Sequence, residues 1–165
     1  MLRFPDAEGL RPTPDRVRET LFNWLGQDLG GLACLDAFAG SGALGFEAAS
    51  RGARRVVMLE TARAVCEALR ANAAQLGLAG VEIHCVEAVS WLRRATEKFD
   101  LIFLDPPFAT DLAARALELA AACLVTGGRV YVEQAAAVQP GPAWKVLRQG
   151  AAGRSHFALL EKTSC

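Results

Sequence analysis

Short apolar runs alternate along this chain with stretches in which apolar residues recur at helical spacing, from residue 33 to residue 133. Short apolar runs predict buried strands, and the helical stretches between them predict the crossovers of a parallel sheet. We predict strands at residues 33–38, 55–59, 82–86, 101–104 and 129–133. The fold class is therefore α/β, with a mostly parallel sheet.

The predicted helices lie between those strands, at residues 44–51, 63–76, 90–94 and 112–124. Gly77 and Gly127-Gly128 are typical helix stop signals, because glycine readily takes the left-handed conformation. Pro140-Gly141-Pro142 then breaks the chain. Beyond it, residues 144–147 and 156–160 predict an antiparallel hairpin at the edge of the sheet.

A further helix is predicted ahead of the first strand, where Thr13 can cap it and Pro14 can occupy its first position. The apolar side chains that follow fall on one helix face: Val17, Leu21, Trp24 and Leu25. A length of 165 residues suits one domain. We divide this domain, residues 1–165, into an N-terminal segment and helix (1–31), a core (32–134) and C-terminal edge strands (135–165).

The composition predicts an ordinary globular protein, with 52% hydrophobic and 22% charged residues. Charges such as Glu118 and Arg129 interrupt the apolar runs, so none reaches the roughly 18 residues that cross a bilayer. The five cysteines form no C-x-x-C pair, and we expect reduced thiols, a cytoplasmic location and no metal site. They are Cys34, Cys66, Cys85, Cys123 and Cys165.

Residues 40–45, Gly-Ser-Gly-Ala-Leu-Gly, match the pattern G-x-G-x-x-G between a predicted strand and a predicted helix. Gly40 and Gly42 would allow close approach of a ligand, and Glu60, at the end of the next strand, would accept bonds from ribose hydroxyls. This pattern is typical of dinucleotide binding. A turn that only packs a helix on a strand is the structural alternative.

Asp36, just before the glycine turn, favours a different ligand. Its carboxylate would repel a pyrophosphate and attract the cationic amino group of a methionine moiety. A buried carboxylate without a partner is costly, which favours a ligand-facing position over one in the core. The sequence thus favours S-adenosylmethionine over NAD, with capping of a local turn as the alternative role for Asp36.

Three further residues complete the predicted cofactor site. Phe38 lies in the same segment as Asp36. Glu87 and Ala88 follow the third strand, where a carboxylate or a main-chain acceptor could meet an adenine amino group. A solvated loop glutamate is an equally good interpretation of Glu87.

Asp105-Pro106-Pro107-Phe108 directly follows the strand predicted at 101–104, at the edge where open α/β sheets bind ligands. An aromatic amine is a poor nucleophile, and the Asp105 carboxylate and Pro106 carbonyl could accept its two protons. The prolines, Pro106 and Pro107, stiffen the turn, and Phe108 offers a face on which a base can stack. We predict methylation of an exocyclic amino group on a base, although a simple strand-ending turn is the alternative.

Three segments resemble the bacterial 16S ribosomal RNA guanine-N2 methyltransferases of the RsmD type: GLRPTPDRVRETLFNWL (residues 9–25), LDAFAGSGALG (35–45) and DPPF (105–108). The resemblance covers nearly the whole chain. It implies a Rossmann-like S-adenosylmethionine-dependent methyltransferase fold, S-adenosyl-L-methionine as donor, and a guanine 2-amino group in 16S rRNA or the 30S ribosomal subunit as acceptor. Members of the family usually have Asp or Asn where this chain has Glu87.

The resemblance also implies roles for particular residues. The cofactor would lie against Asp36, Gly40, Gly42 and Glu60, and the base against Asp105 and Phe108. Arg11, Thr13 and Arg16 would line the mouth of the site, with a solvated cap and helix face as their alternative. We expect a monomer.

Lys plus Arg and Asp plus Glu number 18 each, a balance that does not indicate nonspecific nucleic-acid binding. Within the methyltransferase class, a DNA adenine-N6 or cytosine-N4 enzyme could use the same catalytic turn. An NAD(P)-binding oxidoreductase would share the glycine turn, but 165 residues leave little room for its substrate domain. A cofactor-binding protein without catalytic activity is the last alternative.

Overall fold

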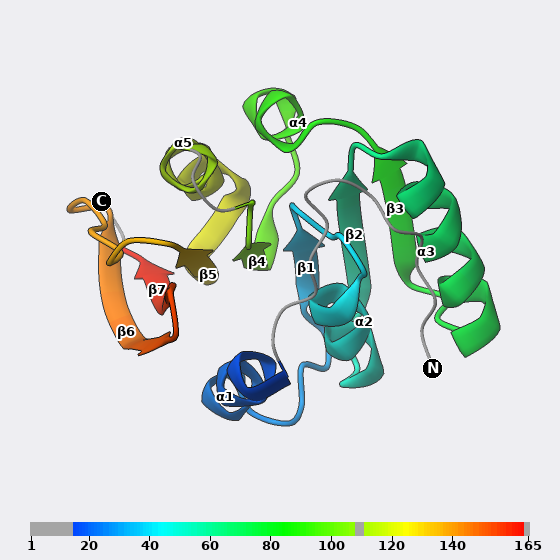
Figure 1. The fold of residues 1–165 in the computed structure, drawn as a ribbon, viewed down its shortest axis with the longest axis horizontal. Coiled ribbons are helices and arrows are strands. Elements are labelled where there is room, and N and C mark those ends of the chain that lie inside the picture. The colour runs from blue at the N-terminus through cyan, green and yellow to red at the C-terminus, as the bar shows by residue number, and fades with distance from the viewer. Residues whose placement is uncertain (1–14, 108–110, 164–165) are drawn as a thin grey trace.

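The computed structural model describes residues 15–107 and 111–163. These residues form a seven-stranded sheet of order β3-β2-β1-β4-β5-β7-β6 (Figure 1). The strands are β1 Ala33–Asp36, β2 Arg55–Glu60, β3 Val81–Cys85, β4 Phe99–Leu104, β5 Leu124–Gln134, β6 Trp144–Ala152 and β7 Ser155–Lys162. The helices are α1 Asp15–Leu25, α2 Ala43–Ser50, α3 Arg63–Leu76, α4 Ala88–Arg94, α5 Leu112–Ala120 and the short 3-10 helix η1 Ala121–Cys123.

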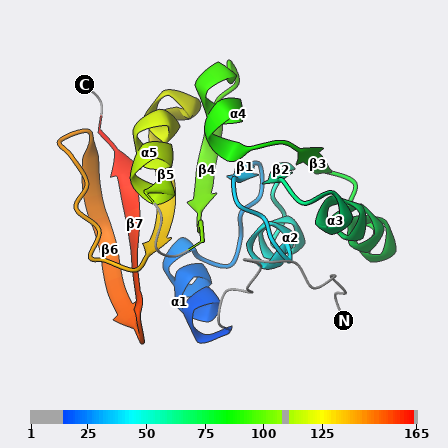
Figure 2. The same cartoon turned by 45° about the horizontal axis from the view of Figure 1, so that its top comes forward.

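The first five strands are parallel, whereas β7 is antiparallel to both β5 and β6. This confirms the predicted mostly parallel sheet with an antiparallel C-terminal hairpin. In Figure 2, β6 and β3 lie at opposite ends of the sheet. Strand β2 lies on one side of β1, and strand β4 lies on the other. The resulting switch point, between the carboxyl ends of β1 and β4, is where open α/β sheets bind ligands.

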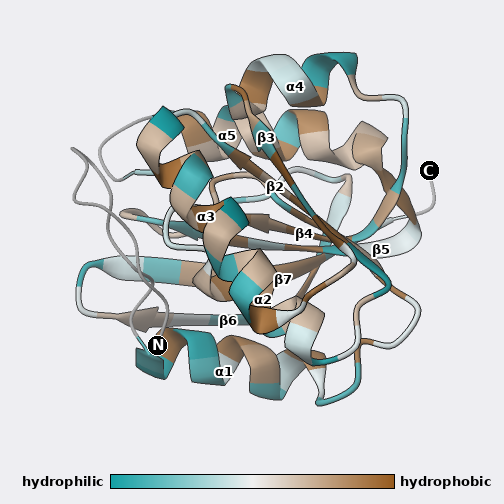
Figure 3. Cartoon of the chain, turned by 90° about the vertical axis from the view of Figure 1, so that its right-hand side faces the viewer, coloured by the Kyte–Doolittle hydropathy of each residue, from teal (hydrophilic) through white to brown (hydrophobic). Residues whose placement is uncertain are grey.

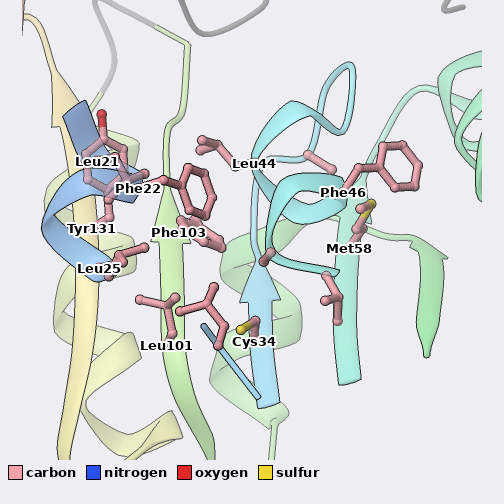
Figure 4. Packing of buried hydrophobic residues seen from close by; sticks show 14 of the residues in the cluster. Leu21, Phe22, Leu25, Cys34, Leu44, Phe46, Met58, Leu101, Phe103 and Tyr131 are labelled. Atoms are coloured by element: carbon pink, nitrogen blue, oxygen red, sulfur yellow. The ribbon is translucent and has the colours of Figure 1, made fainter. Parts of the chain in front are cut away.

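Helices cover both faces of the sheet and define two apolar clusters. On one face, α1 packs on side chains such as Phe103 and Tyr131 and α2 packs on Met58 (Figure 4), whereas α3 covers β2 and β3. On the other face, α4 and α5 pack on side chains such as Ile102 and Val130. Figure 3 shows the central strands largely brown and the helices banded in teal and brown. This is the pattern of a sheet buried on both faces under amphipathic helices.

Helix α1 packs across the middle of the sheet, as its predicted apolar face requires. Its inward residues are Val17, Leu21, Phe22 and Leu25, with Trp24 half-buried. The Phe22 ring lies 6.0 Å from the Phe103 ring of β4, and the Trp24 ring lies 5.5 Å from that of Phe157 on β7. The predicted cap, Thr13, and Pro14 lie outside the described residues.

One predicted helix extends too far. The stretch predicted at 112–124 is helical only to Ala120, continues as η1, and becomes strand at Leu124. Leu124 pairs with Phe99 of β4 and is buried, so sheet pairing overrides the helical spacing. Gly127 therefore lies within β5, where its φ of 78° fits an irregularity in the strand rather than a helix stop.

The first strand is also shorter than predicted, because β1 ends at Asp36 and residues 37–38 belong to the loop that leads into the glycine turn. None of the helices in the described ranges is long and apolar enough to cross a membrane.

Candidate cofactor and catalytic site

The glycine turn connects β1 to α2 through two left-handed residues, Gly40 (φ 54°) and Gly42 (φ 84°). Gly42 caps α2, and a Cβ there would lie 2.5 Å from the Phe46 ring and 2.8 Å from Leu69. Both the backbone angle and the available space thus require glycine at this position. The N-terminus of α2 is therefore held close to the carboxyl end of β1.

Asp36, the last residue of β1, is only 1% exposed. Its Oδ2 accepts a hydrogen bond from the Gly45 N–H at 3.0 Å, whereas its Oδ1 is buried with no donor at hydrogen-bonding geometry among the described residues. Burial raises the pKa of Asp36 to about 7; the N–H groups of Gly45 and Phe38 oppose this rise, and the nearby Asp105 and Glu60 carboxylates add to it. One buried acceptor atom is thus left to receive a cationic or N–H donor.

Glu60 ends β2 and joins that strand to the glycine turn. Its Oε1 accepts from the Gly40 N–H at 3.3 Å and its Oε2 accepts from the Ala62 N–H at 2.7 Å. The carboxylate is half-buried, and each oxygen retains a further lone pair. Glu60 thus lies at the end of the second strand, where the sequence predicted it, and main-chain donors orient its side chain.

Glu87 has a local role that its position in the sequence did not indicate. It is the N-cap of α4, where its carboxylate accepts from the Val89 N–H at 2.7 Å and from the Ser90 N–H and hydroxyl, both at 2.9 Å. Although partial burial opposes ionisation, these bonds lower the pKa of Glu87. Ala88, the first residue of α4, is buried, and the half-buried Phe38 packs on the same α4–α5 side of the sheet.

The turn predicted to be catalytic leaves β4 at Asp105, beside the end of β1. Asp36 is in register with Phe103, and the Ala37 N–H donates to the Phe103 carbonyl at 3.1 Å. The Asp105 carboxylate is close enough to raise the pKa of Asp36, and its Oδ1 is buried. Pro106 is buried and Pro107 is exposed, so one proline of the turn packs against the protein and the other faces solvent.

Some predicted site residues lie outside the described residues, namely Phe108, Arg11 and Thr13. Arg16 lies on the first turn of α1 and is exposed. The structure therefore places Asp36, Glu60 and Asp105 at the same edge of the sheet. Gly40 and Gly42 lie in the turn after Asp36, and the Gly40 N–H bonds to Glu60. Within the described ranges, no group of three or more His, Cys, Asp or Glu residues could hold a metal ion.

Sequence reasoning missed a buried carboxylate near this edge. Glu133, toward the end of β5, is 0% exposed and accepts from the Tyr131 hydroxyl at 2.6 Å and the Ser155 hydroxyl at 2.8 Å. The signal that could have found it is the tyrosine two residues earlier, because residues at that spacing share one face of a strand. Its serine partner comes from β7 and could not be found by local spacing.

Comparison with known proteins identifies the class and then the family. Ribosomal RNA small subunit methyltransferase D of Escherichia coli K12 is 39% identical over 168 residues, which cover 98% of this chain and 84% of that protein. Its namesake from Haemophilus influenzae is 44% identical over 118 residues, covering 69% of this chain and 61% of that protein. The solved structure of yhhF from Escherichia coli has a TM-score of 0.88 at 36% identity, over 98% of this chain and 92% of that chain.

Together with the sheet order and the glycine turn, these relatives define an enzyme with the Rossmann-like methyltransferase fold. These relatives exclude the alternative that the chain is an NAD(P)-binding oxidoreductase. A family model described as Conserved hypothetical protein 95 matches residues 1–161. The chain belongs to this family of RsmD-type methyltransferases, which confirms the resemblance stated from its sequence.

Proposed function

We propose that this enzyme transfers a methyl group from S-adenosyl-L-methionine to the 2-amino group of a guanine in 16S rRNA. The observation that carries the proposal is the convergence of Asp36, Glu60 and Asp105 at the switch point between β1 and β4. The relatives named as small-subunit rRNA methyltransferases support the choice of substrate. The free, buried thiols of Cys34 and Cys123 accord with action in the cytoplasm.

The residues of the glycine turn fit this cofactor. Asp36 Oδ1 is buried without a donor among the described residues, and the ammonium of the methionine moiety would satisfy it. Glu60, whose carboxylate is oriented by the N–H groups of Gly40 and Ala62, would accept from ribose hydroxyls, and Gly40 and Gly42 would let the backbone approach the ligand closely. Phe38, Glu87 and Ala88 would border the adenine, with Ala88 as a main-chain contact because the Glu87 carboxylate caps α4. When bound, S-adenosylmethionine supplies an electrophilic methyl group on a positively charged sulfur.

The catalytic turn acts on the amine. Asp105 and the Pro106 carbonyl would accept the two amine hydrogens, which favours a pyramidal nitrogen whose lone pair points at the methyl group. Because Pro106 is buried and both prolines fix φ, the acceptors are pre-organised before the base arrives. Phe108, whose placement lies outside the described residues, would stack on the base. Arg11, Thr13 and Arg16 would contact the RNA at the mouth of the site.

The test is incubation with labelled S-adenosylmethionine and, in parallel, assembled 30S subunits, naked 16S rRNA or duplex DNA, followed by nucleoside analysis. We expect label in N2-methylguanosine from one of the rRNA substrates. Label in N6-methyladenine or N4-methylcytosine of DNA would contradict the rRNA substrate, and absence of label from all three would contradict the proposed reaction. The control is the Asp28→Asn variant, which changes an exposed carboxylate in the loop before β1.

A further inference from the structure

Two cysteine thiols contact the same short stretch of backbone at the end of β2. Cys66 is buried on α3, and its thiol donates to the Glu60 carbonyl at 3.2 Å. Cys85 is exposed as the last residue of β3, and its thiol donates to the Thr61 carbonyl at 3.6 Å. Because these carbonyls belong to consecutive residues, the two sulfurs converge on one turn.

The two thiols also lie near each other in the fold. Cys85 is in register with Glu60 across the β2–β3 pair, which places it beside the residue that Cys66 contacts. Burial raises the pKa of Cys66 to about 12, and the second cause of the rise is a hydrogen bond with the Cys85 thiol. One thiol of the pair, that of Cys85, is therefore exposed, and the other, that of Cys66, is buried. Cys34 and Cys123, in contrast, are both buried in the apolar clusters.

We propose that Cys66 and Cys85 form an oxidisable dithiol that a hydroperoxide converts into a disulfide. The exposed Cys85 thiolate attacks one peroxide oxygen, the O–O bond breaks, and Cys85 becomes a sulfenic acid, while the departing hydroxide takes up the proton that Cys85 released and leaves as water. The Cys66 sulfur then attacks the Cys85 sulfur, the S–O bond breaks, and the departing hydroxide takes the Cys66 proton to leave as water. In total, two thiols and hydrogen peroxide give one disulfide and two waters.

The disulfide has a structural consequence for the turn at Glu60. Both S–H donors are consumed, so the carbonyls of Glu60 and Thr61 lose the two bonds that the thiols make. The same turn carries the Ala62 N–H, which orients the Glu60 carboxylate together with the Gly40 N–H. Oxidation should therefore displace Glu60 and weaken binding of the cofactor, a consequence that rests on the proposed function.

The experiment treats the reduced, full-length protein with hydrogen peroxide, with and without later dithiothreitol. Disulfides are mapped by peptide mass spectrometry, and affinity for S-adenosylhomocysteine is measured by calorimetry on the same samples. Cys85→Ser and Cys66→Ala remove one thiol each, and Cys123→Ala is the matched control, because it removes a buried thiol outside the pair. Circular dichroism checks that each variant folds.

We expect one cross-link, between Cys66 and Cys85, in the wild type and in Cys123→Ala but in neither pair variant. Affinity should fall about tenfold on oxidation and return with dithiothreitol, because one lost bond to a charged group has that effect. No Cys66–Cys85 peptide, or a cross-link that leaves affinity unchanged, would overturn the proposal. If the reduced protein does not bind S-adenosylhomocysteine, the proposed function fails, while the cross-link still decides the thiol chemistry.

Discussion

Asp36 Oδ2 accepts a hydrogen bond from the Gly45 N–H at 3.0 Å, joining the end of β1 to the first turn of α2. A Cβ at Gly45 would lie 3.2 Å from that oxygen and 2.4 Å from the Met58 methyl group, so a larger residue here would require the Met58 side chain to move. The bond uses one carboxylate oxygen and leaves the other buried. The same residue can thus hold the turn together and contact a ligand.

Asp36→Ala should weaken binding of S-adenosylhomocysteine by about 1–3 kcal/mol, the usual scale for a hydrogen bond to a charged group. Calorimetric titration measures the change. Asp28→Ala is the matched control, because Asp28 also accepts a backbone N–H, from Gly30 at 2.8 Å, but is exposed in the loop before β1. An unchanged dissociation constant in Asp36→Ala, with the fold intact, would place Asp36 outside the pocket.

Affinity for S-adenosylhomocysteine should also depend on pH through Asp36. The pKa of this carboxyl group is raised to about 7, so below that pH the free protein holds it neutral, and the ligand's ammonium must displace a proton. Affinity should rise by up to about tenfold per pH unit toward pH 7 and level off above it. The titration is repeated across this range with Asp36→Asn, which should lack the dependence. An identical pH profile in both proteins would contradict this account.

The glycine turn predicts a contrast between two glycines of positive φ. Gly77→Ala has open space around the added Cβ, so it should cost only the left-handed penalty of about 1–2 kcal/mol. Gly42→Ala adds overlap with Phe46 and Leu69, and should cost about 1–3 kcal/mol more. Urea denaturation of both variants measures the difference. Equal losses of stability would mean that α2 is not held as closely as described.

The buried Glu133 carboxylate predicts the effect of removing one of its donors. Tyr131→Phe deletes the hydroxyl 2.6 Å from Oε1, and the buried acceptor left behind should lower the free energy of unfolding by about 1–3 kcal/mol. Ser155→Ala removes the other donor and should have an effect of the same sign. Denaturation followed by tryptophan fluorescence measures both. If neither variant is destabilised, the network contributes nothing to stability.

The order of strands and helices could be predicted because each is a local pattern. The apolar run before Asp105 and the glycine turn after Asp36 each mark the end of a strand, and parallel strands end at one edge. These two signals were sufficient to predict that the carboxylates of Asp36 and Asp105 lie at the same edge of the sheet. The family follows from segments that are contiguous in the sequence.

Features that depend on contacts across the sheet could not be predicted. Leu124 belongs to a strand because it pairs with Phe99, and nothing in its neighbours along the chain indicates that pairing. Glu133 is stabilised by Ser155 from another strand. Glu87 was open to two interpretations, and its capping bonds to Val89 and Ser90 depend on where α4 begins, the boundary that patterns define least well.

The central claim is that Asp105 acts on the amine rather than on the cofactor. Asn at this position keeps the shape but is a weaker acceptor, and in one orientation its donors oppose the amine hydrogens. Asp105→Asn should therefore keep S-adenosylhomocysteine affinity within a few fold while lowering turnover by about 100-fold or more. Asp28→Asn makes the same chemical change in the loop before β1 and should alter neither quantity.

The most direct measurement pairs the two quantities on the Asp105→Asn variant: calorimetric affinity for S-adenosylhomocysteine and single-turnover methylation of the rRNA substrate, with circular dichroism confirming the fold. The account predicts nearly unchanged affinity together with the large loss of turnover. Loss of both would make Asp105 a cofactor or structural residue. Retention of both would contradict the assignment of the Asp-Pro-Pro-Phe turn as the catalytic site.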